Sequence, residues 1–164
     1  MNLKAYMTNG TFAYLEEMQE KHVISPFLLL ENDIKTVAYY EDEKPSVFTE
    51  SRDYQIIAKQ GSLEEQGYAS LSFIPVTTEG LPIFESEYKK VIQQFSSVVA
   101  ARLLRPMQGN IYVILLEWTD LQDYHKWQAD SPLPTKKNRP YLNGPAYNEI
   151  FQVGRQEEED TNEG

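Results

Sequence analysis

The chain has 164 residues, no cysteine and a formal charge of −10, with 41% hydrophobic and 12% aromatic residues. This length fits one domain or two small ones, and the composition is sufficient for a packed core. The lack of cysteine excludes disulfides, thiolate metal sites and cysteine nucleophiles. The negative charge argues against a nucleic-acid partner. A cytoplasmic protein without a membrane span is expected, since no basic segment precedes an apolar one at the start and the longest apolar run is short.

The pattern of residues 1–60 predicts a small α+β unit. Thr11 can cap a helix over residues 12–21, because its hydroxyl can accept a backbone N–H of the first turn. A further short helix is expected over residues 51–58. The polar segment 59–67, with two glycines and no apolar period, is interpreted as a connector. Four strand-like runs cover residues 3–8, 27–30, 34–40 and 45–48.

The second part, residues 61–153, alternates strands and helices in the order β-α-β-β-α-β. Pro82 suits the first turn of one helix, and Thr119 or Asp120 can cap the other. This order predicts a ferredoxin-like unit, an antiparallel sheet with two helices on one face. Five acidic residues lie among the last eight of the chain, so residues 154–164 are expected to form a disordered acidic tail. The four predicted strands cover residues 68–76, 98–104, 111–118 and 147–153.

Several sequence motifs of the second part resemble one known family. They are TTEG at 77–80, RLLRP at 102–106, YVILLEW at 112–118 and the helix that carries Trp127. This pattern resembles the antibiotic-biosynthesis-monooxygenase (ABM) family, in particular its HmoB-type haem-degrading monooxygenases and the staphylococcal TRAP protein. The opening AYMTNGTFAYL is also similar to that group. The resemblance implies a bacterial protein with an α/β unit before a ferredoxin-like ABM domain of the dimeric α+β barrel type, as a monomer or a homodimer.

The same resemblance implies haem as the cofactor and three positions that would carry oxidative haem degradation. In the haem-degrading relatives these are a strand asparagine, a helix tryptophan and an iron-ligating histidine. In this chain the positions hold Ser72, Trp127 and Lys137. A lysine that keeps its proton has no lone pair for iron, and serine is shorter than asparagine. Trp127 has a second interpretation, as a wall of the core or of a pocket.

The other candidate ligands lie close to Trp127 in the sequence. Tyr124 shares its helix face and is either an iron ligand as a phenolate or a packed ring. His125 is about 200° from Trp127 around the helix, so we expect it to face away. Lys137 and Arg139 belong to a basic cluster that either holds carboxylates, such as haem propionates, or is a solvated loop. No other metal site is expected, because the chain has only two histidines.

Two hypotheses for function follow from these residues. The first is a haem-binding or haem-degrading monooxygenase homologue in which the expected asparagine and histidine are replaced. The alternative is a non-catalytic, TRAP-like regulatory protein, or one that binds a small apolar or haem-like ligand. The hypotheses differ in whether a nitrogen or phenolate ligand points into the cleft beside Trp127, so the sequence leaves open whether the protein is an enzyme.

Overall fold

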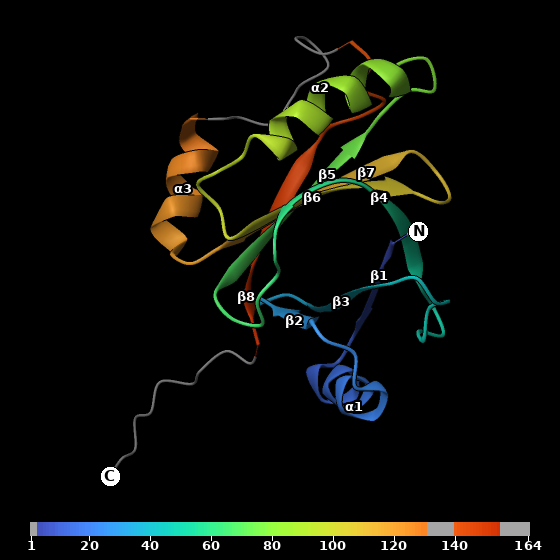
Figure 1. The fold of residues 1–164 in the computed structure, drawn as a ribbon, viewed down its shortest axis with the longest axis vertical. Helices are drawn as coiled ribbons and strands as arrows, with labels where there is room; N and C mark the ends of the chain where they lie inside the picture. Colours follow the sequence, from blue (N-terminus) through green and yellow to red (C-terminus); the bar gives the residue numbers. More distant parts are fainter. Residues whose placement is uncertain (1–2, 131–139, 155–164) are drawn as a thin grey trace.

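Eight antiparallel strands form a closed barrel in the computed structural model, which describes residues 3–130 and 140–154. Three helices lie outside the ring of strands in this part of the chain, α1 on one side and α2 and α3 on the opposite side (Figure 1). Within the same residues no helix has the length and apolarity needed to cross a membrane. The helices are α1 (Phe12–His22), α2 (Leu81–Gln93) and α3 (Leu121–Asp130). The strands are β1 (Lys4–Gly10), β2 (Phe27–Glu31), β3 (Thr36–Asp42), β4 (Arg52–Gly61), β5 (Tyr68–Pro75), β6 (Ala100–Pro106), β7 (Ile111–Trp118) and β8 (Tyr147–Val153).

Each half of the chain contributes four strands to the barrel in the same spatial order. In the second half the order is β8-β5-β7-β6, the arrangement of a ferredoxin-like unit, which confirms the predicted fold class. The first half repeats it as β4-β1-β3-β2, with α1 in the place of α2. An irregular segment, residues 43–51, stands where a second helix would be. The halves join through the pairs β2–β8 and β4–β6, so the barrel has an approximate internal two-fold arrangement.

Three apolar clusters follow from the alternation of side chains along the strands. The first fills the barrel and draws on both halves, from Met7 and Tyr39 to Leu115 and Phe151. The second lies between α2, α3 and the outer face of the second half. The third lies between α1 and the outer face of the first half. The interior cluster joins the two halves, because neither half closes the barrel alone.

The sequence-based prediction for residues 51–58 is wrong, since this segment forms the first part of strand β4. Its pairing with β6 shifts register between Ile56 and Ala58, which places an irregularity in the strand. The shift leaves Ile57 and Ala58 against the same outer cluster, and the regular alternation of a strand is lost. The connector is also shorter than predicted, because β4 continues to Gly61. The run 45–48, which was predicted as a strand, is irregular. The division into two units at residue 60 stays a prediction, and the proposed tail from residue 155 lies outside the described residues.

One end of the barrel is closed around a buried ion pair. The Arg102 guanidinium donates from Nε to Glu41 Oε2 at 2.8 Å, and the two side chains are 4% and 9% exposed. The Tyr39 hydroxyl donates to the same carboxylate oxygen at 2.6 Å. Nη1 of Arg102 donates to three backbone carbonyls, those of Gln60, Gly61 and Ala101. A charge this far from water needs such a set of partners, and the set ties β3, β4 and β6 together.

A second buried carboxyl, Glu117, lies at the same end. Its Oε1 accepts the backbone N–H of Glu64 at 2.8 Å, while Oε2 is buried and has no hydrogen-bond partner in the part of the chain that the structure describes. Burial raises the pKa of Glu117 to about 7, because removing water disfavours the charged form. Leu63 packs against the barrel interior from the same connector. Residues 61–67 therefore act as the plug of this end.

Candidate functional site

The outer face of β5 and β8 places three polar side chains beneath α3. Ser70 and Ser72 alternate with the inward-facing Leu71, and Asn148 lies directly opposite Ser72 in the register of β8. Ser70 Oγ accepts a hydrogen bond from Trp118 Nε1 at 3.1 Å. Ser72 is 1% exposed, and its Oγ has no hydrogen-bond partner within residues 3–130 and 140–154. A buried hydroxyl without a partner costs stability, so Ser72 is a polar position in an otherwise apolar face.

The aromatic residues of helix α3 pack against this face. It begins after Asp120, whose Oδ1 accepts the Gln122 N–H at 2.8 Å, as expected for a helix cap. Trp127 is half-buried, with its ring centroid 5.6 Å from Trp118 and 6.2 Å from Tyr124. Phe95, which follows α2, completes the group at 6.4 Å. The four rings form one aromatic wall between α3, β7 and the end of α2.

The Tyr124 hydroxyl is held within the protein. It donates to Asn148 Oδ1 at 3.4 Å, and Gln128 Nε2 reaches the same oxygen at 3.4 Å. Tyr124 is 3% exposed, and burial raises the pKa of its phenol. A raised pKa opposes the phenolate form that iron ligation requires. Tyr124 therefore fits the second interpretation offered by the sequence, a packed ring with a hydrogen-bonded hydroxyl.

A network of hydrogen bonds on the outer face of the second half fixes helix α2 to strands β6 and β7. Glu85 accepts two hydrogen bonds from Arg105, each of 2.8 Å, and a third from the Tyr112 hydroxyl. Hydrogen bonding from Arg105 lowers the pKa of the Glu85 carboxyl, and burial raises the pKa of Tyr112 to about 12. This arrangement keeps Glu85 ionised and α2 in place, so it supports the site without lining it.

Close packing explains the glycine of the TTEG motif. Gly80 precedes α2, and a Cβ there would collide with the Cβ of Tyr141. Thr77 and Tyr141 are joined by a backbone hydrogen bond of 2.7 Å, so the chain returns directly over the start of α2. Glycine is required by this close approach of two segments rather than by its backbone angles.

The structure brings Trp127, Tyr124 and Ser72 to the same outer face of the second half. His125 is exposed on α3, as its position on the helix predicts. Lys137 and Arg139, interpreted from the sequence as part of a basic cluster that either holds haem propionates or is a solvated loop, lie outside the described residues. Among residues 3–130 and 140–154, no group of three or more histidine or acidic residues is placed to hold a metal ion.

Asn148 is the residue of this face that the sequence interpretation missed. It lies on the strand next to Ser72, the position at which the sequence resemblance implies an asparagine, and it points to the same side of the sheet as Ser72. Its amide already joins Tyr124 and Gln128. The alternation within residues 147–153 indicates which side of the strand Asn148 occupies. That Asn148 lies opposite Ser72 depends on the pairing of β5 with β8, which sequence alone does not reveal.

Comparisons with known proteins agree with this geometry. The chain is 26% identical over 133 residues to a heme-degrading monooxygenase of Listeria monocytogenes, covering 79% of each chain. It is 24% identical over 128 residues to the signal transduction protein TRAP of Staphylococcus aureus, covering 76% of this chain and 77% of that protein. The resemblance to ABM-type monooxygenase-like proteins is confirmed. No protein-family model matches the sequence.

A solved structure shows that the likeness in fold covers nearly the whole chain. It is an uncharacterised ferredoxin-fold protein of Listeria monocytogenes related to antibiotic biosynthesis monooxygenases, with a TM-score of 0.80 and 24% identity. The match covers 94% of this chain and 96% of that one. The likeness therefore includes the N-terminal half of the barrel as well as the half that carries Trp127.

Proposed function

We propose that this ABM-like protein binds a planar, largely apolar ligand beside Trp127, on the outer face of its second half, with haem as the first ligand to test. The observation that carries the proposal is the half-buried Trp127 ring, packed on Trp118 and Tyr124 on the same outer face as the Ser72 hydroxyl, which has no hydrogen-bond partner among the described residues. An aromatic wall with a few polar groups is the usual construction of a small-molecule site. The similarity to a heme-degrading monooxygenase supports haem as the candidate.

Iron ligation does not fit the described residues of this face. Tyr124 is neutral, buried and hydrogen-bonded, and His125 is exposed on α3. An oxidative step at iron has no protein ligand among these groups, so none is derived. A non-catalytic role in binding or regulation agrees better with them, and the similarity to TRAP supports that class.

Oxidative haem degradation is the second candidate, favoured by the similarity to the Listeria enzyme and by the presence of Trp127. It requires an iron ligand from elsewhere in the chain, and Lys137 occupies the position that corresponds to the ligating histidine. An ammonium group has no lone pair for iron, so this candidate depends on a deprotonated Lys137 or on another ligand.

A titration with haemin and with metal-free protoporphyrin, followed by absorbance, tests both candidates. Saturable binding of both porphyrins, weakened about tenfold or more by Trp127→Leu and unchanged by His125→Ala, supports ligand binding without iron ligation. A Soret shift specific to haemin and abolished by Lys137→Ala or Tyr124→Phe supports the enzyme. The absence of saturable binding by either porphyrin would exclude haem from both candidates.

A further inference from the structure

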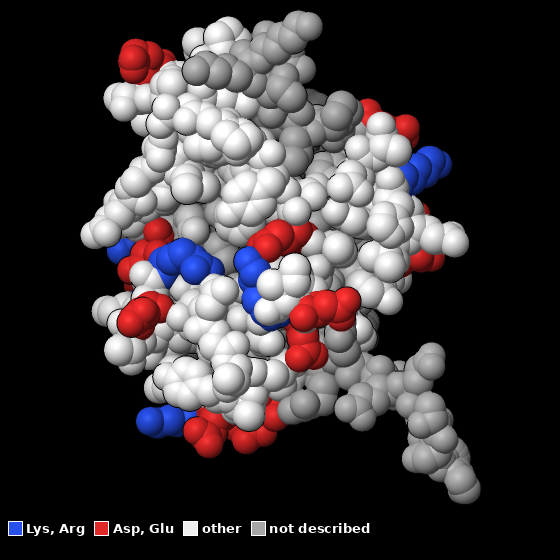
Figure 2. Space-filling model, turned by 180° about the vertical axis from the view of Figure 1, so that it is seen from behind, with Lys and Arg blue, Asp and Glu red and all other residues white. Residues whose placement is uncertain are grey.

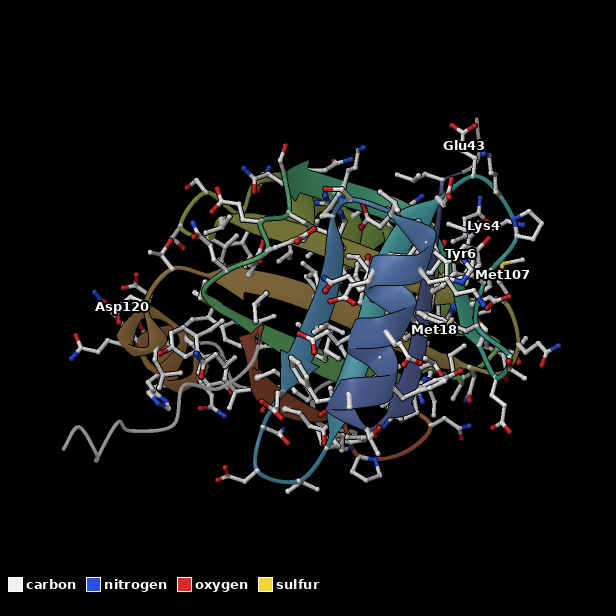
Figure 3. All side chains as sticks on the ribbon, turned by 90° about the horizontal axis from the view of Figure 1, so that it is seen from below. Lys4, Tyr6, Met18, Glu43, Met107 and Asp120 are labelled. Carbon is white, nitrogen blue, oxygen red and sulfur yellow. The ribbon has the colours of Figure 1, made fainter. Side chains whose placement is uncertain are left out.

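A cavity of about 490 Å³ occupies the end of the barrel opposite the plug. Its lining includes residues of every strand except β2, because the strand ends meet there in a ring. Met107, on its rim, and Asp120, at the start of α3, lie at opposite ends of the molecule in Figure 3. The cavity is therefore separate from the face beside Trp127, and its volume lies in the usual range of small-molecule sites.

The wall of this cavity carries a stacked aromatic pair. Phe73 and Tyr147 are direct partners across β5 and β8, with ring centroids 5.0 Å apart and an angle of 22° between the ring planes. Tyr147 is 53% exposed, and Met107 and Ile111 on the rim are 50% and 45% exposed. Large apolar side chains that surround a cavity while remaining in water are typical of a binding site.

The charged groups of the lining differ in their partners. Lys35 and Glu149 neutralise each other through an ion pair of 2.7 Å. Arg52 pairs in register with Met7 of the barrel interior, so it lies on the inward face of β4, and its Nη2 donates to the neutral Asn9 Oδ1 at 2.7 Å. Within residues 3–130 and 140–154, no carboxylate lies in ion-pair range of Arg52.

The neighbouring acid does not fill this role. Asp53 and Ser51 also border the cavity, but Asp53 follows Arg52 in β4, so its side chain points to the outer side of the barrel, where its carboxylate accepts the Ser51 hydroxyl. On the face that Figure 2 shows, basic groups lie next to acidic groups. Arg52 differs from that pattern, because among the described residues its guanidinium has the neutral side chains of Asn9 and Tyr54 as partners and no carboxylate, at the edge of a cavity with aromatic walls.

We propose that the open end of the barrel binds a small aromatic carboxylate, with its ring against Phe73 and Tyr147 and its carboxylate on Arg52. A guanidinium presents parallel N–H donors that match the two oxygens of a carboxylate. The stacked rings offer a flat surface at one side of the same cavity, where another ring can pack. The proposal is independent of haem binding, which concerns a different face of the molecule.

Titration of the full-length ¹⁵N-labelled protein with indole-3-acetate, followed by NMR, tests this site. We expect saturable shifts at the amides of Arg52, Phe73 and Tyr147, and binding of the neutral indole-3-acetamide that is weaker by about tenfold or more. Equal binding of the acid and the amide would overturn the role of Arg52. Shifts confined to α3, or no saturable shift, would overturn the site.

Two variants of the same strand separate the carboxylate contact from a general effect of charge. Arg52→Gln removes the cation at the cavity, and Lys59→Gln removes an exposed cation near the other end of β4. We expect Arg52→Gln to reproduce the loss of affinity, about tenfold or more, and Lys59→Gln to bind as the unaltered protein does. Equal weakening by both variants would show that only the net charge matters and would overturn the proposal.

Discussion

The two ends of the barrel are built from similar residues that meet different surroundings. At the closed end Arg102 and Glu41 are buried, share five hydrogen bonds with their neighbours and each other, and are covered by the plug at 61–67. At the open end Lys35 and Glu149 form an equally short ion pair, with side chains 34% and 19% exposed. Because the two distances are nearly equal, we expect burial rather than the distance between the charges to decide how much each ion pair matters to the stability of this fold.

The largest expected effect on the free energy of unfolding comes from breaking the buried Arg102–Glu41 ion pair. Arg102→Met leaves the Glu41 carboxylate buried without a counter-charge, so the free energy of unfolding is expected to fall by about 3–5 kcal/mol. Urea unfolding at pH 7 measures this change. Arg52→Met removes an arginine from the open end and is expected to cost under about 1 kcal/mol. Similar losses in the two variants would contradict the comparison of the ends.

The next effect concerns Glu117 and depends on pH. Its folded-state pKa of about 7 lies above the ordinary value of 4.5, so its contribution to stability is fully present below about pH 4.5 and is lost as the pH rises through about 7. Glu117→Gln stays neutral and is expected to be more stable than the unaltered protein at pH 8, by about 3 kcal/mol at most. Unfolding by urea between pH 5 and pH 8 measures the difference.

Glu43→Gln is the control for this experiment, because it changes the charge equally at an exposed site. It is expected to keep the decline of stability between pH 5 and pH 8. If Glu117→Gln has the same pH dependence as the unaltered protein, then Glu117 is already ionised at neutral pH in the folded protein, which contradicts the prediction.

A smaller effect is expected from the plug itself. Leu63 packs against the barrel interior and is half-buried, so Leu63→Ala is expected to lower the free energy of unfolding by about 1–2 kcal/mol. Met107→Ala at the open rim removes an exposed side chain and is expected to change it by under about 0.5 kcal/mol. Thermal unfolding of both variants compares the two ends directly, and an equal shift would refute the assignment of residues 61–67 as a plug.

The smallest effect is expected for the exposed pair at the open end. Lys35→Met is expected to cost about 0–1 kcal/mol, and less in 1 M salt, because water and ions already screen the interaction with Glu149. Unfolding at low and high salt measures both values. A large loss that salt does not reduce would mean that the pair is more deeply desolvated than its exposure indicates.

Most of the second half of the barrel could be predicted from sequence, since its patterns are regular. Residues 111–118 form a nearly continuous apolar run, and Leu121, Tyr124 and Trp127 follow helical spacing; the observed β7 and α3 match these two patterns. The prediction of a helix over residues 51–58 was wrong because the register of β4 shifts between Ile56 and Ala58, and this shift breaks the alternation that identifies a strand. The closing pairs β2–β8 and β4–β6 join distant segments, and no local pattern records them.

The candidate site was predictable to the extent that single residues determine it. Trp127 and Tyr124 could be placed on one face from helical spacing, and His125 on the other. Asn148 and Arg52 required the register between strands, because their role depends on what lies opposite them. The burial of Tyr124, which opposes its role as an iron ligand, likewise depends on how α3 packs rather than on the local sequence.

The repeated strand order of the two halves has a consequence for how the molecule can vary. In a barrel assembled from two identical chains, every substitution appears twice, at positions related by symmetry. Here both halves belong to one chain, so each substitution appears once. One half is therefore free to carry α3 and its tryptophan, while the other keeps only an irregular segment at 43–51. A single polypeptide can thus specialise its two outer faces independently.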